Sequence, residues 1–134
     1  MPEPRRRELR VHNRERGIDM LYGEMLTFLR NECKAMASAI VSKDGSVLAS
    51  DVPDDISEET FGIMSATIMG ASVTAAIELK KDPPSRVVFE TKDTKTIIMN
   101  ASRKRIIVVV VPSSTDPDLV EQSSQVLMTA LRKE

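Results

Sequence analysis

The sequence predicts an α/β (α+β) domain with a five-stranded antiparallel sheet flanked by helices, in the order α-β-β-α-β-β-β-α. Three observations predict it. Segments with apolar residues at helical spacing alternate with short segments rich in β-branched residues. Within each group of strands, only a few turn-forming residues separate neighbours, which favours antiparallel pairing. The run Ile106–Val111 is apolar on both faces, as in a central strand that helices cover on both sides.

The first helix and the first two strands occupy residues 18–50. One apolar stripe at helical spacing predicts a helix over Ile18–Lys34, with Cys33 on the stripe as a small core residue. Two short strands, Met36–Ser42 and Ser46–Ser50, follow it. The turn Lys43-Asp44-Gly45 joins them, since glycine tolerates the positive φ of tight turns.

The second helix is predicted from about Ser57 to Lys81, after a linker at residues 51–55. Asp55 is the expected N-cap, and the proline pair that follows Asp82 ends the helix. No residue from Thr60 to Ile77 is charged, although 29% of the chain is. A surface helix normally keeps a charged face for water, so this segment needs cover on more than one side.

Three strands and a final helix complete the chain. The strands are predicted at Arg86–Thr91, Thr94–Asn100 and Lys104–Val111, joined by short connections into a meander. Arg86–Thr91 mixes charged and apolar residues, which is typical of an edge strand or of one that meets another chain. Asp116 can cap the last helix, and Pro117 suits its first position.

Length and composition predict one domain at residues 17–134, preceded by a basic and flexible tail at residues 1–16. The tail carries six Arg and three Glu, a local charge of 6 − 3 = +3, and its removal should leave the fold intact. The net charge of −1 and the scarcity of aromatic residues argue against a nucleic-acid partner. One cysteine, no signal peptide and no transmembrane segment predict a cytoplasmic protein.

A helical wheel places two apolar faces on opposite sides of the second helix. The bulkier face is expected to lie on the sheet of its own chain, and it consists of Phe61, Met64, Ile68, Ala75 and Leu79. The other face is small at its centre and permits close approach of a second helix; it consists of Ile63, Ala66, Gly70, Val73 and Ile77. The simplest cover for it is a second copy of the chain, and the alternative is another helix of the same chain.

Catalytic motifs are missing from the sequence, so we expect a protein that is not an enzyme and holds no cofactor or metal. No glycine precedes a lysine, so the phosphate-binding loop of P-loop GTPases is absent. The only histidine, His12, lies in the tail. The aspartates at positions 44, 51, 54 and 55 are expected to form turns and caps rather than a cation site. The basic run Arg103–Arg105 is expected to be solvated, with an arginine-finger role as the alternative.

These elements together resemble the roadblock / dynein light chain family. The resemblance covers Ile18 to Leu131 and rests on the hairpin Ala39–Ala49, the small-residue helix Phe61–Leu79 and the strand ending at Pro112. It implies a roadblock/longin/profilin-like fold. It also implies a homodimer, or a heterodimer with a paralogue, in which the second helices lie side by side and the third strands pair. The strand residues then at the interface are Arg86, Val87, Val88, Phe89 and Thr91.

The resemblance also implies a function, because prokaryotic members of this family look like regulators or scaffolds of Ras-like small GTPases. The GTPase would dock on the outer surface of the paired helices, for which the ribbon of Thr60, Thr67 and Thr74 is the candidate. Two alternatives stay open. One is a structural adaptor in a motor- or membrane-associated complex. The other is a PAS-like small-molecule sensor, which would need a cavity between the sheet and the second helix.

Overall fold

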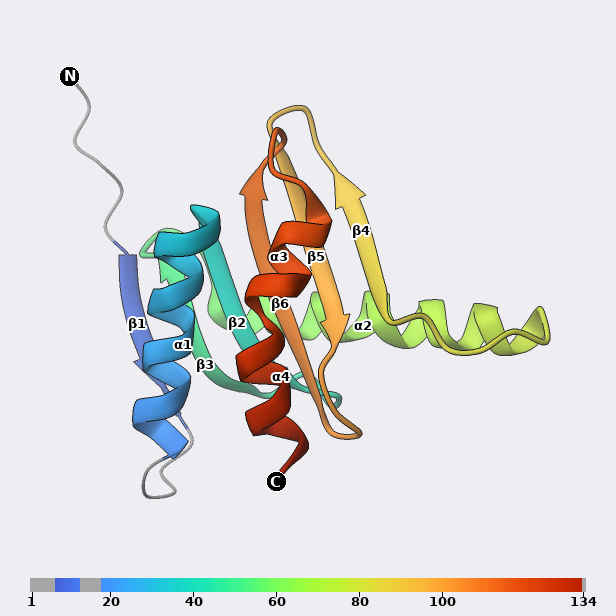
Figure 1. Cartoon of the computed structure of the whole chain (residues 1–134). Coiled ribbons are helices and arrows are strands. Elements are labelled where there is room, and N and C mark those ends of the chain that lie inside the picture. Colours follow the sequence, from blue (N-terminus) through green and yellow to red (C-terminus); the bar gives the residue numbers. More distant parts are fainter. Residues whose placement is uncertain (1–6, 13–17, 134) are drawn as a thin grey trace.

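The computed structural model of the protein describes residues 7–12 and 18–133. Four helices and six strands lie in this part of the chain (Figure 1). In chain order they are β1 (Arg7–Val11), α1 (Ile18–Cys33), β2 (Ala37–Ser42), β3 (Val47–Pro53), α2 (Glu58–Glu78), β4 (Arg86–Glu90), β5 (Thr94–Asn100), β6 (Arg105–Pro112), α3 (Pro117–Ser123) and α4 (Gln125–Arg132).

The strands form one antiparallel sheet in the order β1-β3-β2-β6-β5-β4, with helices on both faces. Helices α1, α3 and α4 cover one face, and α2 lies across the other face by itself (Figure 1). The larger core cluster lies on the three-helix face and the smaller one lies under α2. Strand β6 is buried on both faces, as its apolar sequence predicts, so that Ile107 packs in the larger cluster and Val108 in the smaller.

The sixth strand, β1, comes from the segment expected to be a tail. Its backbone pairs with β3 from Arg7 opposite Pro53 to Val11 opposite Ala49. The strand is short and only partly buried, and its charged residues hide its β character in the sequence. Strand β3 is correspondingly longer than predicted. Its last three residues, expected to be a linker, are fully buried between β1 and β2.

A buried ion cluster around Asp51 holds β1 in place. The Asp51 side chain is 0% exposed, and its carboxylate accepts hydrogen bonds from Arg7 of β1 at 2.6 Å and from Arg30 Nε of α1 at 2.9 Å. Arg7 also donates to the backbone carbonyl of Ala35 at 2.6 Å. Burial lowers the pKa of Arg7, whereas the hydrogen bond to Asp51 raises the pKa of Arg30. The cluster therefore joins β1, α1 and β3 at one point of the fold.

Two helix boundaries differ from the predicted ones. The N-cap of α2 is Ser57, not Asp55, because its hydroxyl accepts a hydrogen bond from the backbone N–H of Thr60 at 3.2 Å. The last helix is divided into α3 and α4 at the buried Ser124, whose hydroxyl donates to the carbonyl of Val120 at 2.7 Å. The predicted cap at Asp116 is confirmed.

Candidate interaction surface

Helix α2 contacts the sheet through a narrow stripe of small and flexible residues. Only Gly62, Ser65 and Met69 of this helix are buried. A Cβ added to Gly62 would lie 2.6 Å from a methyl carbon of Val47 and 3.1 Å from the carbonyl oxygen of Gly45. The absence of a side chain at Gly62 therefore allows the helix to approach β3 and the preceding turn closely.

This stripe corrects the predicted packing of the helix. The bulkier face was expected to lie on the sheet, yet Met64 and Leu79 are exposed, by 49% and 70% of their surface, and Phe61 and Ile68 are half-buried. The stripe that contacts the sheet lies between the two predicted apolar faces of the helix. Neither face is therefore centred on the sheet. The physical reason is the close approach at Gly62, which brings the small residues nearest to the strands.

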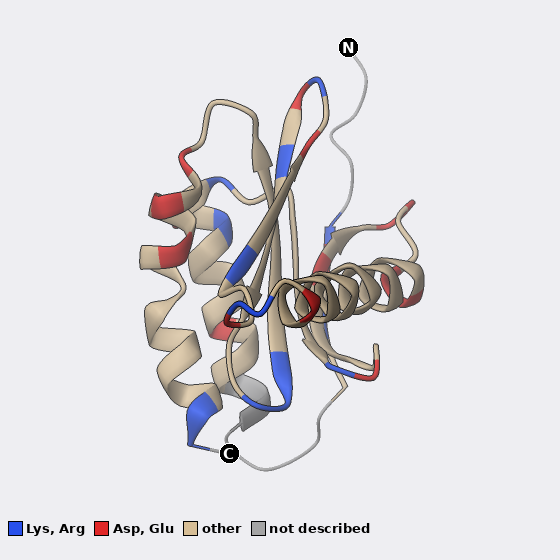
Figure 2. Ribbon diagram, turned by 90° about the vertical axis from the view of Figure 1, so that its right-hand side faces the viewer, with Lys and Arg blue, Asp and Glu red and all other residues tan. Residues whose placement is uncertain are grey.

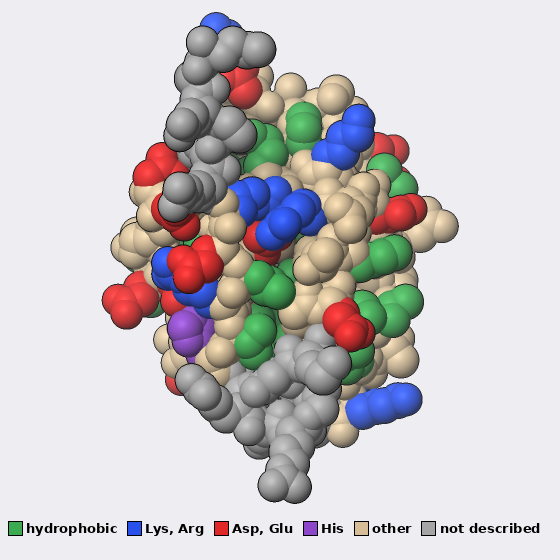
Figure 3. Space-filling view, turned by 90° about the vertical axis from the view of Figure 1, so that its left-hand side faces the viewer, with side chains coloured by type: hydrophobic (Ala, Val, Ile, Leu, Met, Phe, Trp, Pro, Cys, Tyr) green, Lys and Arg blue, Asp and Glu red, His purple; other side chains and the backbone are tan. Residues whose placement is uncertain are grey.

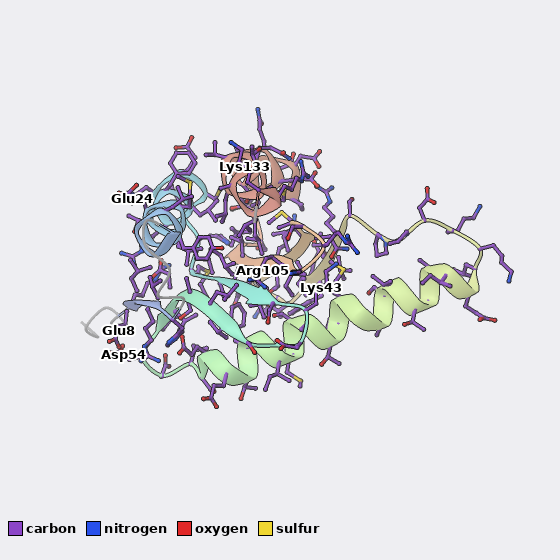
Figure 4. The ribbon with its side chains drawn as sticks, turned by 90° about the horizontal axis from the view of Figure 1, so that it is seen from below. Glu8, Glu24, Lys43, Asp54, Arg105 and Lys133 are labelled. Atoms are coloured by element: carbon purple, nitrogen blue, oxygen red, sulfur yellow. The ribbon has the colours of Figure 1, made fainter. Side chains whose placement is uncertain are left out.

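The C-terminal half of α2 projects beyond the β4 edge of the sheet. Figure 4 shows the helix from below, continuing past the strands, and Figure 2 looks onto the same edge with α2 nearly end-on. No residue of α2 after Met69 is buried, and Ile77 is 60% exposed. By length and composition this one helix could also cross a membrane, which is weak evidence by itself, so the absence of a membrane span stays a prediction.

A small hollow lies beside α2 on the predicted dimer face. It measures about 170 Å³, and its lining consists of Lys43, Ala66, Met69, Gly70, Val73, Asn100 and Ile106. A Cβ added to Gly70 would meet nothing within 4 Å, so the helix is open to solvent there. Ligand pockets usually measure roughly 300–1,000 Å³. The hollow is small for a sensor site, although it lies where the sensor alternative requires a cavity.

The second part of the surface is the outer edge of β4. This strand is the last of the sheet, paired on one side with β5. Val87 packs against the core under α2 and Val88 against the opposite core, whereas Phe89 and Thr91 are exposed. Arg86 pairs with Asp118 at 2.8 Å and with Glu121 at 3.3 Å, both on α3. Its guanidinium is therefore engaged within the chain.

The predicted interface residues of α2 follow one side of the helix. Ile63, Gly70 and Ile77 are exposed along it, while Ala66 and Val73 are half-buried where they border the hollow. The structure thus brings the predicted helix residues onto one continuous strip, with the β4 residues along the sheet edge that the helix crosses. Whether these residues meet a second chain stays a prediction.

The threonine ribbon lies on the side of α2 away from the sheet. Thr60, Thr67 and Thr74 are all exposed. The hydroxyl of Thr67 donates to the carbonyl of Ile63, one turn earlier in the helix, at 2.8 Å. This is the outer surface on which a docking partner was expected.

A polar pocket of about 360 Å³ lies at the N-terminal end of α2, near β1. There His12 Nε2 lies 2.6 Å from a carboxylate oxygen of Glu58, and Arg10 lies 3.8 Å from the same carboxylate. Figure 3 faces this side of the molecule and shows basic, acidic and histidine side chains together. In the part of the chain that the structure describes, no group of three metal-ligating side chains gathers.

The four aspartates were expected to form turns and caps, which is correct for Asp44 and wrong for Asp51, whose buried carboxylate pairs with Arg7 and Arg30. Asp44 accepts hydrogen bonds from the Ser42 hydroxyl and from the Ser46 backbone N–H, and these bonds lower its pKa to about 2. Asp51 is buried in the ion cluster described above, and Asp54 is exposed. Asp44 therefore shapes the turn around Gly45, whose φ is +95°, as the sequence predicts.

Comparison with known families and proteins shows which of them this chain is similar to. A family model described as the Roadblock/LC7 domain matches residues 21–111. Two uncharacterised proteins of Methanocaldococcus jannaschii are each 29% identical to the chain over 72 residues, which is 54% of this chain and 63% of each relative. The chain thus spans less than two thirds of the length of these curated relatives.

Two solved structures show the same fold. MglB of Myxococcus xanthus is 16% identical with a TM-score of 0.73, over 82% of this chain and 93% of that chain. An MglB with tetrameric arrangement is 18% identical with a TM-score of 0.71, over 84% of this chain and 88% of that chain. The predicted fold class and the resemblance stated from the sequence are confirmed, apart from the added strand β1.

Proposed function

Since the chain belongs to the Roadblock/LC7 domain family, we propose that it is a dimeric, non-enzymatic regulator or scaffold of a Ras-like small GTPase. One observation carries the proposal. An apolar helix that overhangs the sheet edge leaves a continuous unpartnered surface along α2 and β4. Exposed apolar residues that lie next to one another are typical of protein interfaces.

A second copy of the chain is the cover that we propose for the inner part of this surface. Gly70 lies at the centre of the strip, with the exposed side chains of Ile63 and Ile77 on either side of it. Two such helices related by a two-fold axis can place each isoleucine of one copy beside the small residues of the other. The open edge of β4 can pair with its counterpart, because antiparallel strands are compatible with the same axis. The tetrameric arrangement of one MglB structure supports self-association of this fold.

The outer side of the paired helices is the proposed docking surface for the GTPase. Thr60, Thr67 and Thr74 stay exposed after the inner strip is covered, because they lie on the side of α2 away from the sheet. We assign the protein a role in holding the GTPase, with no catalytic group of its own. A structural adaptor would use the same dimer but would bind its partner independently of the nucleotide.

Solution mass tests the dimer first. One chain has a mass of 14.9 kDa, and light scattering across a dilution series should give twice this value for the wild type. The Gly70→Leu variant should give the mass of one chain. Because a Cβ added to Gly70 would meet nothing within 4 Å and leucine favours a helix more than glycine does, the variant should fold at least as stably as the wild type. Ala71→Leu, on the outer side of the same helix, is the matched control and should remain dimeric. A dimeric Gly70→Leu variant would place the interface elsewhere.

Binding to purified small GTPases from the same organism tests the second part. We expect one of them to bind in only one of its GDP-loaded and GTP-loaded states. Thr67→Arg should abolish this binding and leave the dimer intact. If a GTPase bound equally well in its GDP-loaded and GTP-loaded states, the structural adaptor would be favoured. If no small GTPase bound in either state, the proposal of a GTPase partner would be refuted.

A further inference from the structure

Three segments that lie far apart in the sequence bring basic residues to one end of the molecule. These segments are the β2–β3 turn, the β5–β6 turn and the C-terminal end of α4 (Figure 1). The backbone N–H of Lys43 donates to the carbonyl of Lys104 at 3.0 Å, which joins the two turns directly. Figure 4 looks onto this end, with Lys43, Arg105 and Lys133 labelled. The sequence predicts the run Arg103–Arg105 as solvated, with an arginine-finger role as the alternative, and it does not predict that these segments come together, because their proximity depends on the fold.

A cleft lies between the β5–β6 turn and the end of α4. Its volume is about 530 Å³, and its lining consists of Ser102, Arg103, Lys104, Leu131 and Arg132. Leu131 is buried, so it forms an apolar floor, while the three basic side chains are exposed. The turn is held by hydrogen bonds from the Ala101 and Ser102 backbone N–H groups to the carbonyl of Arg105. The cleft is thus supported by ordered backbone on one side and by a helix on the other.

The charge of the cleft is not balanced within the described chain. No acidic residue lines it, and Arg103, Lys104 and Arg132 form no ion pair among residues 7–12 and 18–133. The carbonyl end of a helix carries about half a negative charge, which offsets only part of three positive charges. The three positive side chains of the cleft repel one another, so a bound anion would stabilise this end of the molecule.

We propose that this cleft binds a compact ligand that carries two or more phosphate groups. Arginine donates two parallel hydrogen bonds to a phosphate and lysine adds a point charge, so the lining suits clustered phosphates. The volume lies within the roughly 300–1,000 Å³ of small-ligand sites. Such phosphates occur both on soluble molecules and on lipid headgroups. Titration with a soluble ligand tests the first source, and vesicle flotation tests the second. None of the five residues that line the cleft lies on α2 or β4, and the neighbouring Lys43 lines the hollow beside α2 instead. The proposed ligand does not depend on the proposed GTPase.

Calorimetric titration with inositol trisphosphate tests the site in the whole 134-residue chain. We expect saturable binding, and Arg103→Glu combined with Lys104→Glu should weaken it about tenfold or more, because two of the three basic residues that line the cleft are reversed in charge. Lys81→Glu combined with Lys92→Glu is the matched control, since both lysines are exposed and the change of net charge is the same. The milder pair Arg103→Gln and Lys104→Gln repeats the test with less effect on folding, which circular dichroism checks.

Flotation with phosphatidylcholine vesicles distinguishes the source of the phosphates. Binding to vesicles that contain phosphatidylinositol bisphosphate, and not to vesicles of equal charge made with phosphatidylserine, would assign the site to a lipid headgroup. Binding of soluble inositol trisphosphate with no flotation would assign it to a free ligand. Equal weakening by the control pair, or no binding of either probe, would overturn the proposal. The solution mass should stay unchanged in all variants, so a failure here is distinct from a failure of the dimer.

Discussion

Replacing Arg7 by methionine should destabilise the whole domain, although Arg7 lies in a segment that the sequence presents as a tail. Methionine keeps an unbranched side chain and removes the charge. The change deletes the hydrogen bond to Asp51 and the one to the carbonyl of Ala35, both 2.6 Å long. Asp51 is 0% exposed, so water cannot replace the lost partner without local opening.

The expected loss follows from the remaining contacts. A hydrogen bond to a charged group contributes about 1.5–3 kcal/mol, and removing one partner of a buried ion pair costs about 3–5 kcal/mol. Asp51 still keeps Arg30 after the change, so we expect Arg7→Met to lower the free energy of unfolding by about 2–3 kcal/mol. Asp51→Asn leaves two arginines facing each other without a counter-charge and should cost about 3 kcal/mol or more.

Urea denaturation followed by circular dichroism measures both variants, with the free energy extrapolated to water. Arg10→Met is the matched control, because Arg10 lies in the same strand and pairs at the surface with Glu8 at 2.9 Å. That variant should be indistinguishable from the wild type. If Arg7→Met also left the free energy of unfolding unchanged, β1 would not be docked in solution. The segment would then be the tail that the sequence suggests.

Two further predictions concern the turn and the helix that flank the surface. Hydrogen bonds from the Ser42 hydroxyl and the Ser46 backbone give Asp44 a pKa of about 2 instead of 3.8, so its contribution to stability is present above its ordinary pKa and is lost as the pH falls toward about 2. NMR titration of the Asp44 carboxyl should show this midpoint, and Ser42→Ala should raise it; an unmoved midpoint would contradict the assigned cause. Gly62→Ala should lower stability by about 1–3 kcal/mol, because its methyl group would lie 2.6 Å from Val47; a stable variant in urea would show that α2 can shift freely.

Local sequence patterns predicted most elements because their causes are local. The turn at Gly45, the cap at Asp116 and the doubly apolar strand β6 each depend on a few neighbouring residues. Strand β1 was missed because its partner β3 lies about forty residues away in the sequence. The residues of β1 alone do not indicate which strand it pairs with. The only sequence signal was the pair of apolar residues Leu9 and Val11 at alternate positions among the arginines.

The sequence by itself determined that the second helix has too little charge for a helix covered on one side only. In the structure its own sheet buries only Gly62, Ser65 and Met69, and cover by a second chain stays a prediction. Tertiary structure alone decided which side meets the sheet. A helical wheel ranks faces by apolarity, whereas packing selects the face that permits the closest approach, and Gly62 supplies it. The burial of Asp51 and the basic cleft around Arg103 were likewise decided by the tertiary structure. Burial and charge density are properties of segments brought together in space, and no local pattern encodes them.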